Sequence, residues 1–124
     1  MSDPSISSFA EALVHLVRDR AIQNCDARLT SGTRSPIGRY WQAALEDKNS
    51  KTIGNLIIPD CVDEAIFCLL NAIDEGGLKL IYVDRNGKLL DLLKDGLGEL
   101  AGWYEGADSW RHKFSSQRIN DYLT

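Results

Sequence analysis

Apolar residues recur at intervals of three and four along the first quarter of the chain, and this spacing predicts a helix that ends near Leu29. Asp3-Pro4 is a suitable N-cap followed by a proline in the first helical position, and Ser8 with Glu11 offers an alternative start through a capping box. The apolar stripe consists of Ala10, Leu13, Val14, Val17, Ala21 and Cys25. The opposite, polar side is expected to carry Arg18, Asp19, Arg20, Gln23 and Asn24.

A second amphipathic helix is predicted after a break at residues 30–34. Ser35-Pro36 again combines a cap with a proline in the first helical position. The polar residues 47–55 that follow the helix predict a loop with at most one helical turn. The apolar face of this short helix is Ile37, Tyr40, Trp41, Ala44 and Leu45.

The third predicted helix, at about residues 60–75, is the most apolar. Asp60 after Pro59 is its expected cap, and Gly76-Gly77 ends it. Because apolar residues cover more than half of its circumference, we expect a central helix that other elements cover on several sides. These residues are Val62, Ala65, Ile66, Phe67, Leu69, Leu70 and Ile73.

A β-hairpin is predicted at about residues 78–92. Two short apolar runs flank Asp84-Arg85-Asn86-Gly87, a strong turn sequence. Since two strands alone are marginally stable, the hairpin must pack on the helices. Further on, residues 99–104 predict one or two helical turns, and residues 110–123 a helix that Ser115-Ser116 could interrupt.

These elements predict an α+β, mainly helical fold in which four to six helices surround the central helix. A chain of 124 residues can bury one real core, and we expect a single globular domain over residues 1–124. No apolar stretch reaches the length of a bilayer span, and the N-terminus lacks the features of a signal peptide. We therefore expect a cytoplasmic protein with no membrane partner.

Acidic residues are concentrated in the middle of the chain. Residues 57–108 hold eleven Asp or Glu and four Lys or Arg, whereas residues 1–56 hold six and seven. Such a surface repels nucleic acid and attracts basic proteins. We expect the partner contact here, with Trp103 or Tyr104 exposed beside the acids. The candidate contact residues are Asp60, Asp63, Glu64, Asp74, Glu75, Asp84, Asp91, Asp95, Glu99, Trp103, Tyr104, Glu105 and Asp108.

No motif predicts catalysis, a metal site or a cofactor. Glu11 with His15 and Asp108 with His112 are each four residues apart, but a zinc site needs three or four ligands, so paired surface side chains are favoured. The glycines at 96 and 98 lack the strand and helix of a dinucleotide site. The basic and aromatic residues 110–118 are expected to pack and to pair with acids of residues 57–108.

The three cysteines are expected to be reduced. Their number is odd and no C-x-x-C spacing occurs, which argues against disulfides and a zinc knuckle. Because free cysteine is usually buried, at least two of them are expected in the core. They are Cys25, Cys61 and Cys68.

Three segments together resemble the small immunity proteins of bacterial contact-dependent growth inhibition. They are Ser35-Pro36-Ile37-Gly38-Arg39-Tyr40-Trp41, Lys51-Thr52-Ile53-Gly54-Asn55-Leu56, and the start of an acid-capped apolar helix at residues 58–60. Gly98-Glu99-Leu100 and Tyr104 are similar to a Gly-Glu-rich segment near the end of that family. The resemblance implies a protein that binds a cognate toxin domain, often a basic nuclease, stoichiometrically and without chemistry of its own.

Two other functions are open from the sequence. One is a small enzyme with a dispersed site at His15 or His112. The other is an adaptor or homo-oligomer that uses an apolar patch around Ile37, Tyr40 and Trp41. For an immunity protein we expect a monomer or weak dimer, and reversal of charge at Asp84, Asp91 and Asp95 is expected to weaken toxin binding.

Overall fold

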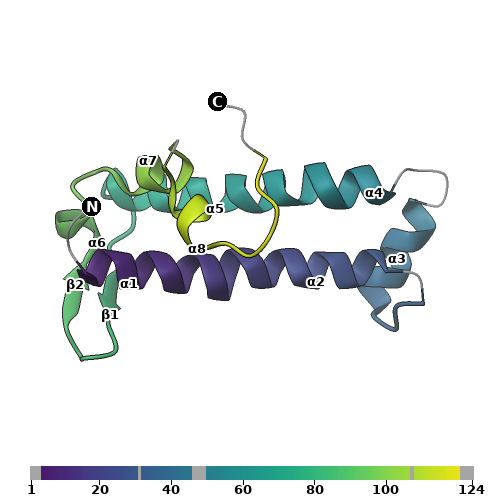
Figure 1. Ribbon diagram of the computed structural model, residues 1–124, viewed down its shortest axis with the longest axis horizontal. Helices are drawn as coiled ribbons and strands as arrows, with labels where there is room; N and C mark the ends of the chain where they lie inside the picture. The colour runs from purple at the N-terminus through teal and green to yellow at the C-terminus, as the bar shows by residue number, and fades with distance from the viewer. Residues whose placement is uncertain (1–3, 31, 46–49, 107, 121–124) are drawn as a thin grey trace.

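Two long helices lie side by side and antiparallel along the whole molecule (Figure 1). This computed structural model describes residues 4–30, 32–45, 50–106 and 108–120. The first long helix joins α1 (Pro4–Leu13), the π-helical segment η1 (Val14–Asp19) and α2 (Arg20–Leu29). The second joins α4 (Ser50–Thr52), the π-helical segment η2 (Ile53–Ile57) and α5 (Ile58–Asp74). The mainly helical α+β prediction is confirmed.

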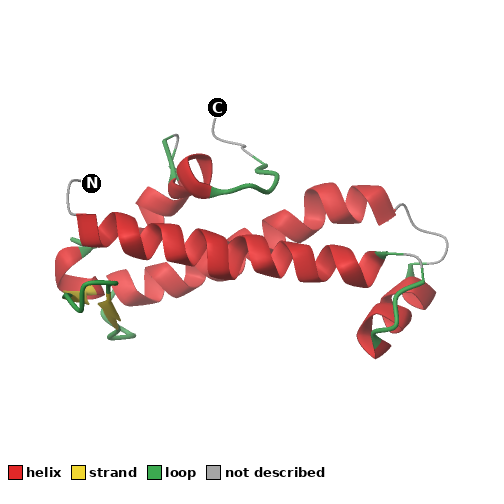
Figure 2. Ribbon diagram, turned by 60° about the horizontal axis from the view of Figure 1, so that its bottom comes forward, coloured by secondary structure: helices red, strands yellow, loops and turns green. Residues whose placement is uncertain are grey.

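Shorter elements close both ends of this helix pair. Helix α3 (Pro36–Ala44) lies at one end, and the hairpin of β1 (Ile81–Val83) and β2 (Leu89–Asp91) lies at the other (Figure 2). The hairpin is antiparallel, with Tyr82 opposite Leu90. Helices α6 (Leu92–Asp95), α7 (Leu100–Glu105) and α8 (Trp110–Phe114) follow, and α7 packs along α5. None of the described helices is long and apolar enough to cross a bilayer.

One apolar core joins the helix pair to the hairpin, α7 and α8. It includes residues from α1, η1, α5, β2, α6, α7 and α8. The predicted cap of α3 is present, because the Ser35 side chain accepts from the Gly38 N–H at 3.1 Å. The predicted cap Asp3 lies outside the described residues. The core residues are Ile6, Ala10, Leu13, Val14, Ile66, Leu70, Ile73, Leu90, Leu92, Leu100, Ala101, Tyr104 and Trp110.

The prediction that the third helix begins at Asp60 is wrong, since the helix starts at Ser50 and runs through Pro59. A proline inside a helix removes one N–H and crowds the carbonyl four residues before it. Segment η2 accommodates this by wider turns, in which the Ile58 N–H donates to the Ile53 carbonyl, five residues earlier. The last predicted helix ends at Phe114, at the interruption that Ser115-Ser116 offers, and residues 115–120 are neither helix nor strand, with a bend at 116–117.

Helix α5 packs on the first helix and on α7 but keeps one face open to solvent. Cys61, Ala65 and Cys68 are exposed there, and Cys25 on α2 is half-buried. The expectation of two core cysteines is therefore wrong. All three cysteines are free thiols, as predicted.

Candidate functional site

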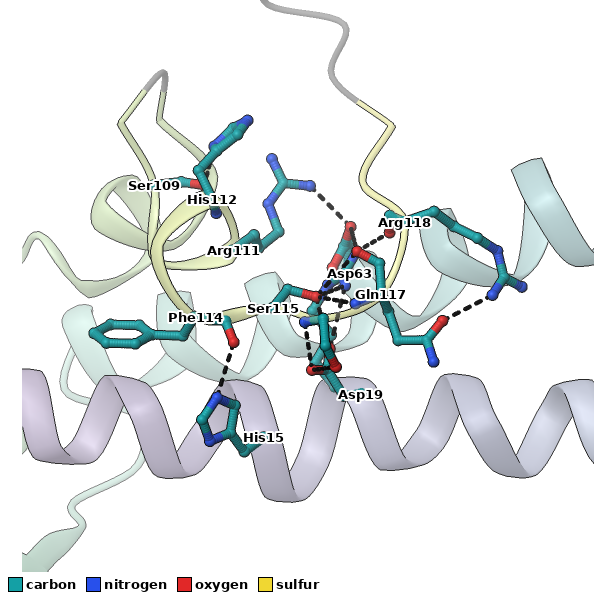
Figure 3. A network of polar contacts seen from close by, with 12 residues as sticks. His15, Asp19, Asp63, Ser109, Arg111, His112, Phe114, Ser115, Gln117 and Arg118 are labelled. Carbon is teal, nitrogen blue, oxygen red and sulfur yellow. Dashed lines mark hydrogen bonds and ion pairs between the residues drawn. The ribbon is translucent and has the colours of Figure 1, made fainter.

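Asp63 lies at the junction of four elements and is buried, with 4% of its surface exposed. Its Oδ1 accepts from Arg18 Nε of η1 at 2.7 Å and from the Tyr104 hydroxyl of α7 at 2.6 Å. Its Oδ2 accepts from Arg111 Nη1 of α8 at 2.8 Å (Figure 3). One carboxylate thus ties η1, α7 and α8 to α5.

The buried charges of this network cancel. Arg18, Asp19, Asp63 and Arg111 are all buried, and they supply two positive and two negative charges. Neutrality matters because an unpaired buried charge costs several kcal/mol. The network therefore leaves the net charge of −4 to the rest of the chain.

Contacts within the network fix the protonation states of Asp63 and Tyr104. Burial alone would raise the pKa of Asp63, but hydrogen bonds from Arg18 and Tyr104 hold it below the ordinary value. Burial and the Asp63 charge raise the pKa of the Tyr104 hydroxyl, which stays a neutral donor. A fixed carboxylate with three donors holds a structure together and has no spare proton to transfer.

A π-helical segment brings Arg18 and Asp19 into the interior together. Neighbours in a regular α-helix point about 100° apart, and the wider turn of η1 shifts the face that meets α5. Val17, predicted in the apolar stripe, is 46% exposed, while Arg18 and Asp19, predicted on the polar side, are buried. A hint was present in the sequence, since Arg18 lies four residues after Val14 and four before Ile22, both buried.

Asp19 binds the C-terminal segment at Ser115 and Ser116. Its Oδ1 accepts from the Ser115 hydroxyl at 2.7 Å, and its Oδ2 accepts from the Ser116 N–H at 2.9 Å. Arg18 adds hydrogen bonds to the Ser115 hydroxyl and the Arg118 carbonyl, both at 2.8 Å. The network thus extends from the core to residues 115–118.

The contribution of Asp63 to stability is expected to fall in acid. Because its folded-state pKa lies below the unfolded value of about 3.9, this contribution is complete above that pH and is lost as the pH falls through the folded pKa. Urea unfolding of the wild type and Asp63→Asn measures it as a difference. We expect a constant difference from pH 7 to 5 that shrinks below about pH 4. A difference of equal size at pH 7 and pH 3 would contradict this assignment.

Two of the predicted contact residues are not at the surface. Asp63 is 4% exposed and Tyr104 is 0% exposed, so neither is available to a partner of the folded chain. Trp103 is half-buried, with its ring 6.2 Å from that of Trp110. The expectation of an exposed Tyr104 is wrong because its hydroxyl is needed by Asp63 in the interior.

The acids of the hairpin region have local structural roles. Asp84 accepts from the N–H groups of Asn86 and Lys88, and Asp91 accepts from the N–H groups of Leu93 and Lys94 at the start of α6. Asp95 accepts from the Asp91 N–H at 3.0 Å. Residues 78–95 also carry four Lys or Arg against these three carboxylates. The hairpin is therefore not the acidic part of the surface.

The remaining acids gather along α5 and α7. Glu64 and Glu75 are eleven residues apart, about three helical turns, and so share one face of α5. Asp74 accepts from the N–H groups of Leu100 and Ala101 at 3.0 Å, which places Glu99 beside it. We call this surface the α5–α7 acidic face. Its residues are Glu64, Glu75, Glu99 and Glu105, and the backbone-bound Asp74 lies beside them.

Like charges lie close together on the acidic face. Burial raises the pKa of Glu105, and the negative charges of Asp63 and Glu64 raise it further against the opposing effect of Arg111. Two predicted residues border the face. Asp60 accepts from the Asn120 amide at 3.0 Å, and Asp108 lies 3.8 Å from Lys113 Nζ.

The cations near the C-terminus have internal partners. Arg111 pairs with Asp63, as expected for an acid of residues 57–108, but Arg118 pairs with Asp26 of α2, at 2.7 Å between Nη2 and Oδ1. Trp110 is buried, as expected.

The two histidines are engaged separately. The Nε2 of His15 lies 2.8 Å from the Phe114 carbonyl, and Nδ1 lies 3.9 Å from Glu11. The Nδ1 of His112 lies 2.7 Å from the Ser109 hydroxyl. Within the described part of the chain, no three His, Cys, Asp or Glu side chains are grouped for a metal ion. The alternative of a dispersed enzyme site at His15 or His112 stays a prediction.

Two other surfaces have potential for binding. An open groove of about 610 Å³ runs between α1 and the hairpin turn, where the Ser8 and Tyr82 hydroxyls are 2.8 Å apart. On α3, Ile37 is 49% and Tyr40 75% exposed, while Trp41 is half-buried beneath the Arg28 guanidinium. The adaptor hypothesis stays a prediction on this second patch.

Comparison of the chain with protein-family models, with curated proteins and with solved structures finds no match. The resemblance to immunity proteins therefore stays a prediction from the sequence.

Proposed function

We propose that the protein is an immunity protein that binds a basic toxin domain through the α5–α7 acidic face. The observation that carries this proposal is the uncompensated charge of that face. Residues 52–78 and 95–110, which include all of α5 and α7, contain no Lys or Arg. Arg18 of η1 and Arg111 of α8 lie nearby, but both form ion pairs with Asp63 inside the molecule.

Such a surface is suited to capture a cationic protein. Complementary charges speed association and exclude partners of the wrong sign. A bound cation would also reduce the repulsion between these carboxylates, since the negative charges of Asp63 and Glu64 raise the pKa of Glu105. The buried network holds α7 on α5, so the charges of the two helices keep fixed positions relative to each other. In this proposal the protein acts in the cytoplasm, stoichiometrically and without catalysis.

The test uses the toxic nuclease domain that we expect to be encoded immediately upstream. A variant with Glu64→Lys, Glu75→Lys and Glu99→Lys removes three exposed carboxylates of the face. We expect its association rate constant to fall at least about tenfold at low salt, with a shallower salt dependence. Biolayer interferometry measures the rate, and co-expression measures protection from the toxin.

A matched control is Glu11→Lys, which reverses one exposed helical carboxylate outside the face; it is to be compared with Glu64→Lys alone. We expect the first to leave binding unchanged. The proposal fails if the wild type does not bind and neutralise the toxin, and the acidic-face contact fails if the triple variant binds as well as the wild type. Reversal of charge at Asp84, Asp91 and Asp95, which the sequence suggests, is a poor test, because these carboxylates accept backbone hydrogen bonds in the turn and at α6.

A further inference from the structure

Strand β1 of the hairpin has an open outer edge. The Leu92 N–H donates to the Leu80 carbonyl, so this pair is one of the hydrogen-bonded pairs of the ladder. Because bonded and non-bonded pairs alternate in an antiparallel ladder, the N–H and C=O groups of Ile81 and Val83 point away from β2. No hydrogen bond joins these groups to any residue that the structure describes. The outer edge of β1 can therefore pair with a further strand.

The outer edge of β2 is closed by the chain itself. The Asp91 N–H donates to the Asp95 carboxylate at 3.0 Å. The Asp91 carboxylate in turn accepts from the N–H groups of Leu93 and Lys94, which begins α6 directly after the strand. A strand can therefore be added to the hairpin at β1 and not at β2.

The groove between the first long helix and the hairpin lies beside this edge. Figure 1 shows β1 on the side of the hairpin toward the middle of the molecule, and β2 toward its end. The groove has Ala12 and Leu16 of the helix on one side and Tyr82 and Asp84 on the other, and Leu16 is 56% exposed. A strand added to β1 would lie between β1 and this helix, with its backbone on the strand edge and alternate side chains turned toward the helix.

The residues along β1 define the chemistry of the segment that would pair with it. Ile81 and Val83 are 56% and 55% exposed on the outer face of the hairpin, whereas Tyr82 between them packs against the core. Lys79 and Arg85 lie two residues before and two residues after this apolar pair, and both are exposed. Neither forms an ion pair with a described residue. A complementary strand therefore has apolar side chains in its middle and a carboxylate toward each end.

We propose that the outer edge of β1 binds an extended segment of another protein, in which apolar residues are flanked by carboxylates. A second copy of this chain is a poor occupant, because antiparallel pairing of two β1 strands about Tyr82 would place Lys79 opposite Arg85. The partner differs in charge from the basic toxin expected at the α5–α7 acidic face. The site therefore does not depend on toxin neutralisation, and its test uses no toxin.

The experiment titrates the full-length chain into a fluorescein-labelled peptide of the sequence Asp-Thr-Val-Thr-Val-Thr-Asp and follows fluorescence anisotropy at low salt. The order of its side chains is the same in both directions, so the test assumes no strand direction. The comparison peptide has lysine in place of both aspartates. We expect the acidic peptide to bind at least about tenfold more tightly than the basic one, with a difference that shrinks as salt is added. Equal affinities, or no binding of either peptide by millimolar protein, would overturn the proposal.

Charge reversal on the chain tests which residues select the peptide. The double variant Lys79→Glu with Arg85→Glu is expected to prefer the basic peptide, because both flanking cations become carboxylates. Lys94→Glu is the matched control for Lys79→Glu alone, since Lys94 is an exposed cation on α6, outside β1. We expect this control to leave both affinities within about twofold of the wild type. A double variant that still prefers the acidic peptide would contradict recognition at β1.

Amide hydrogen exchange locates the bound peptide without any variant. In the free chain we expect the Ile81 and Val83 amides to exchange at least about tenfold faster than the Leu92 amide, which donates within the ladder. Saturation with the acidic peptide is expected to slow exchange at Ile81 and Val83 by at least about fivefold, because their N–H groups gain acceptors. If exchange at these two amides stayed the same in the bound chain, the peptide would lie elsewhere and the proposal would be wrong.

Discussion

Asp63→Asn is expected to lower the free energy of unfolding by about 3–5 kcal/mol, the usual cost of removing one partner from a buried ion pair. The substitution keeps the shape of the side chain but removes its charge. Arg18 and Arg111 would then share a buried environment with Asp19 alone, which leaves one uncompensated positive charge. Urea unfolding at pH 7, followed by circular dichroism, measures the change.

The control for this prediction is Glu64→Gln, which removes the same charge from the next residue. Glu64 is exposed, and its carboxylate accepts a weak hydrogen bond from the Cys68 thiol at 3.6 Å. We expect a change within about 0.5 kcal/mol, as for most surface substitutions. If Asp63→Asn cost no more than this control, the network would not be what ties α7 and α8 to the long helices.

Trp110→Ala is expected to cost about 3–5 kcal/mol, the range for deleting a large buried aromatic side chain. Trp110 is 1% exposed and begins α8. Its ring lies 6.0 Å from Phe9 of α1, edge to face, and 6.2 Å from Trp103 of α7. Loss of this side chain would leave a cavity between α1, α7 and α8 that these helices can only partly fill.

Trp41→Ala provides the comparison for Trp110, because it deletes the same side chain from α3, outside the main core cluster. Trp41 is half-buried and contacts the Arg28 guanidinium, 5.6 Å from its ring centre. We expect it to cost less than half as much in the same urea experiment. Equal costs for the two variants would show that α8 is not anchored through Trp110.

Asp63 and Trp110 hold different parts of α7 and α8 in place, and both support the same surface. Asp63 fixes Arg111 and Tyr104, while Trp110 fixes the start of α8 against α1. Since α7 carries Glu105 and follows Glu99, both anchors support the position of the acidic face. If the proposed function holds, we expect either variant to weaken toxin binding only near its own melting temperature, where α7 begins to loosen.

Local pattern predicted the elements whose causes are local. The three-and-four spacing to Leu29, the Ser35 cap with Pro36, and the turn between the two strands each depend on residues within a few positions of one another. The same is true of the net acidity, which is a property of composition. These predictions needed no knowledge of what packs against what.

Tertiary structure decided which side of each helix faces inward where the helix is irregular. The π segment η1 moved Val17 outward and brought Asp19 in beside Arg18, and the wide turns of η2 carried the helix through Pro59. Neither π segment follows from propensity. Each is accommodated by partners far along the chain, Ser115 and Ser116 for the first and Arg118 and Asn120 for the second.

For the candidate site, too, one part was determined by the sequence and another by the tertiary structure. The sequence by itself determined that this protein has an acidic middle segment, because charge counts require no coordinates. Only the tertiary structure decided which acids remain for a partner: Asp63 is buried between arginines 45 and 48 residues away, and the hairpin acids bind their own backbone. The physical reason is that a carboxylate serves a partner only where folding has left it unpaired, and pairing between distant residues is fixed by the packing of the whole chain.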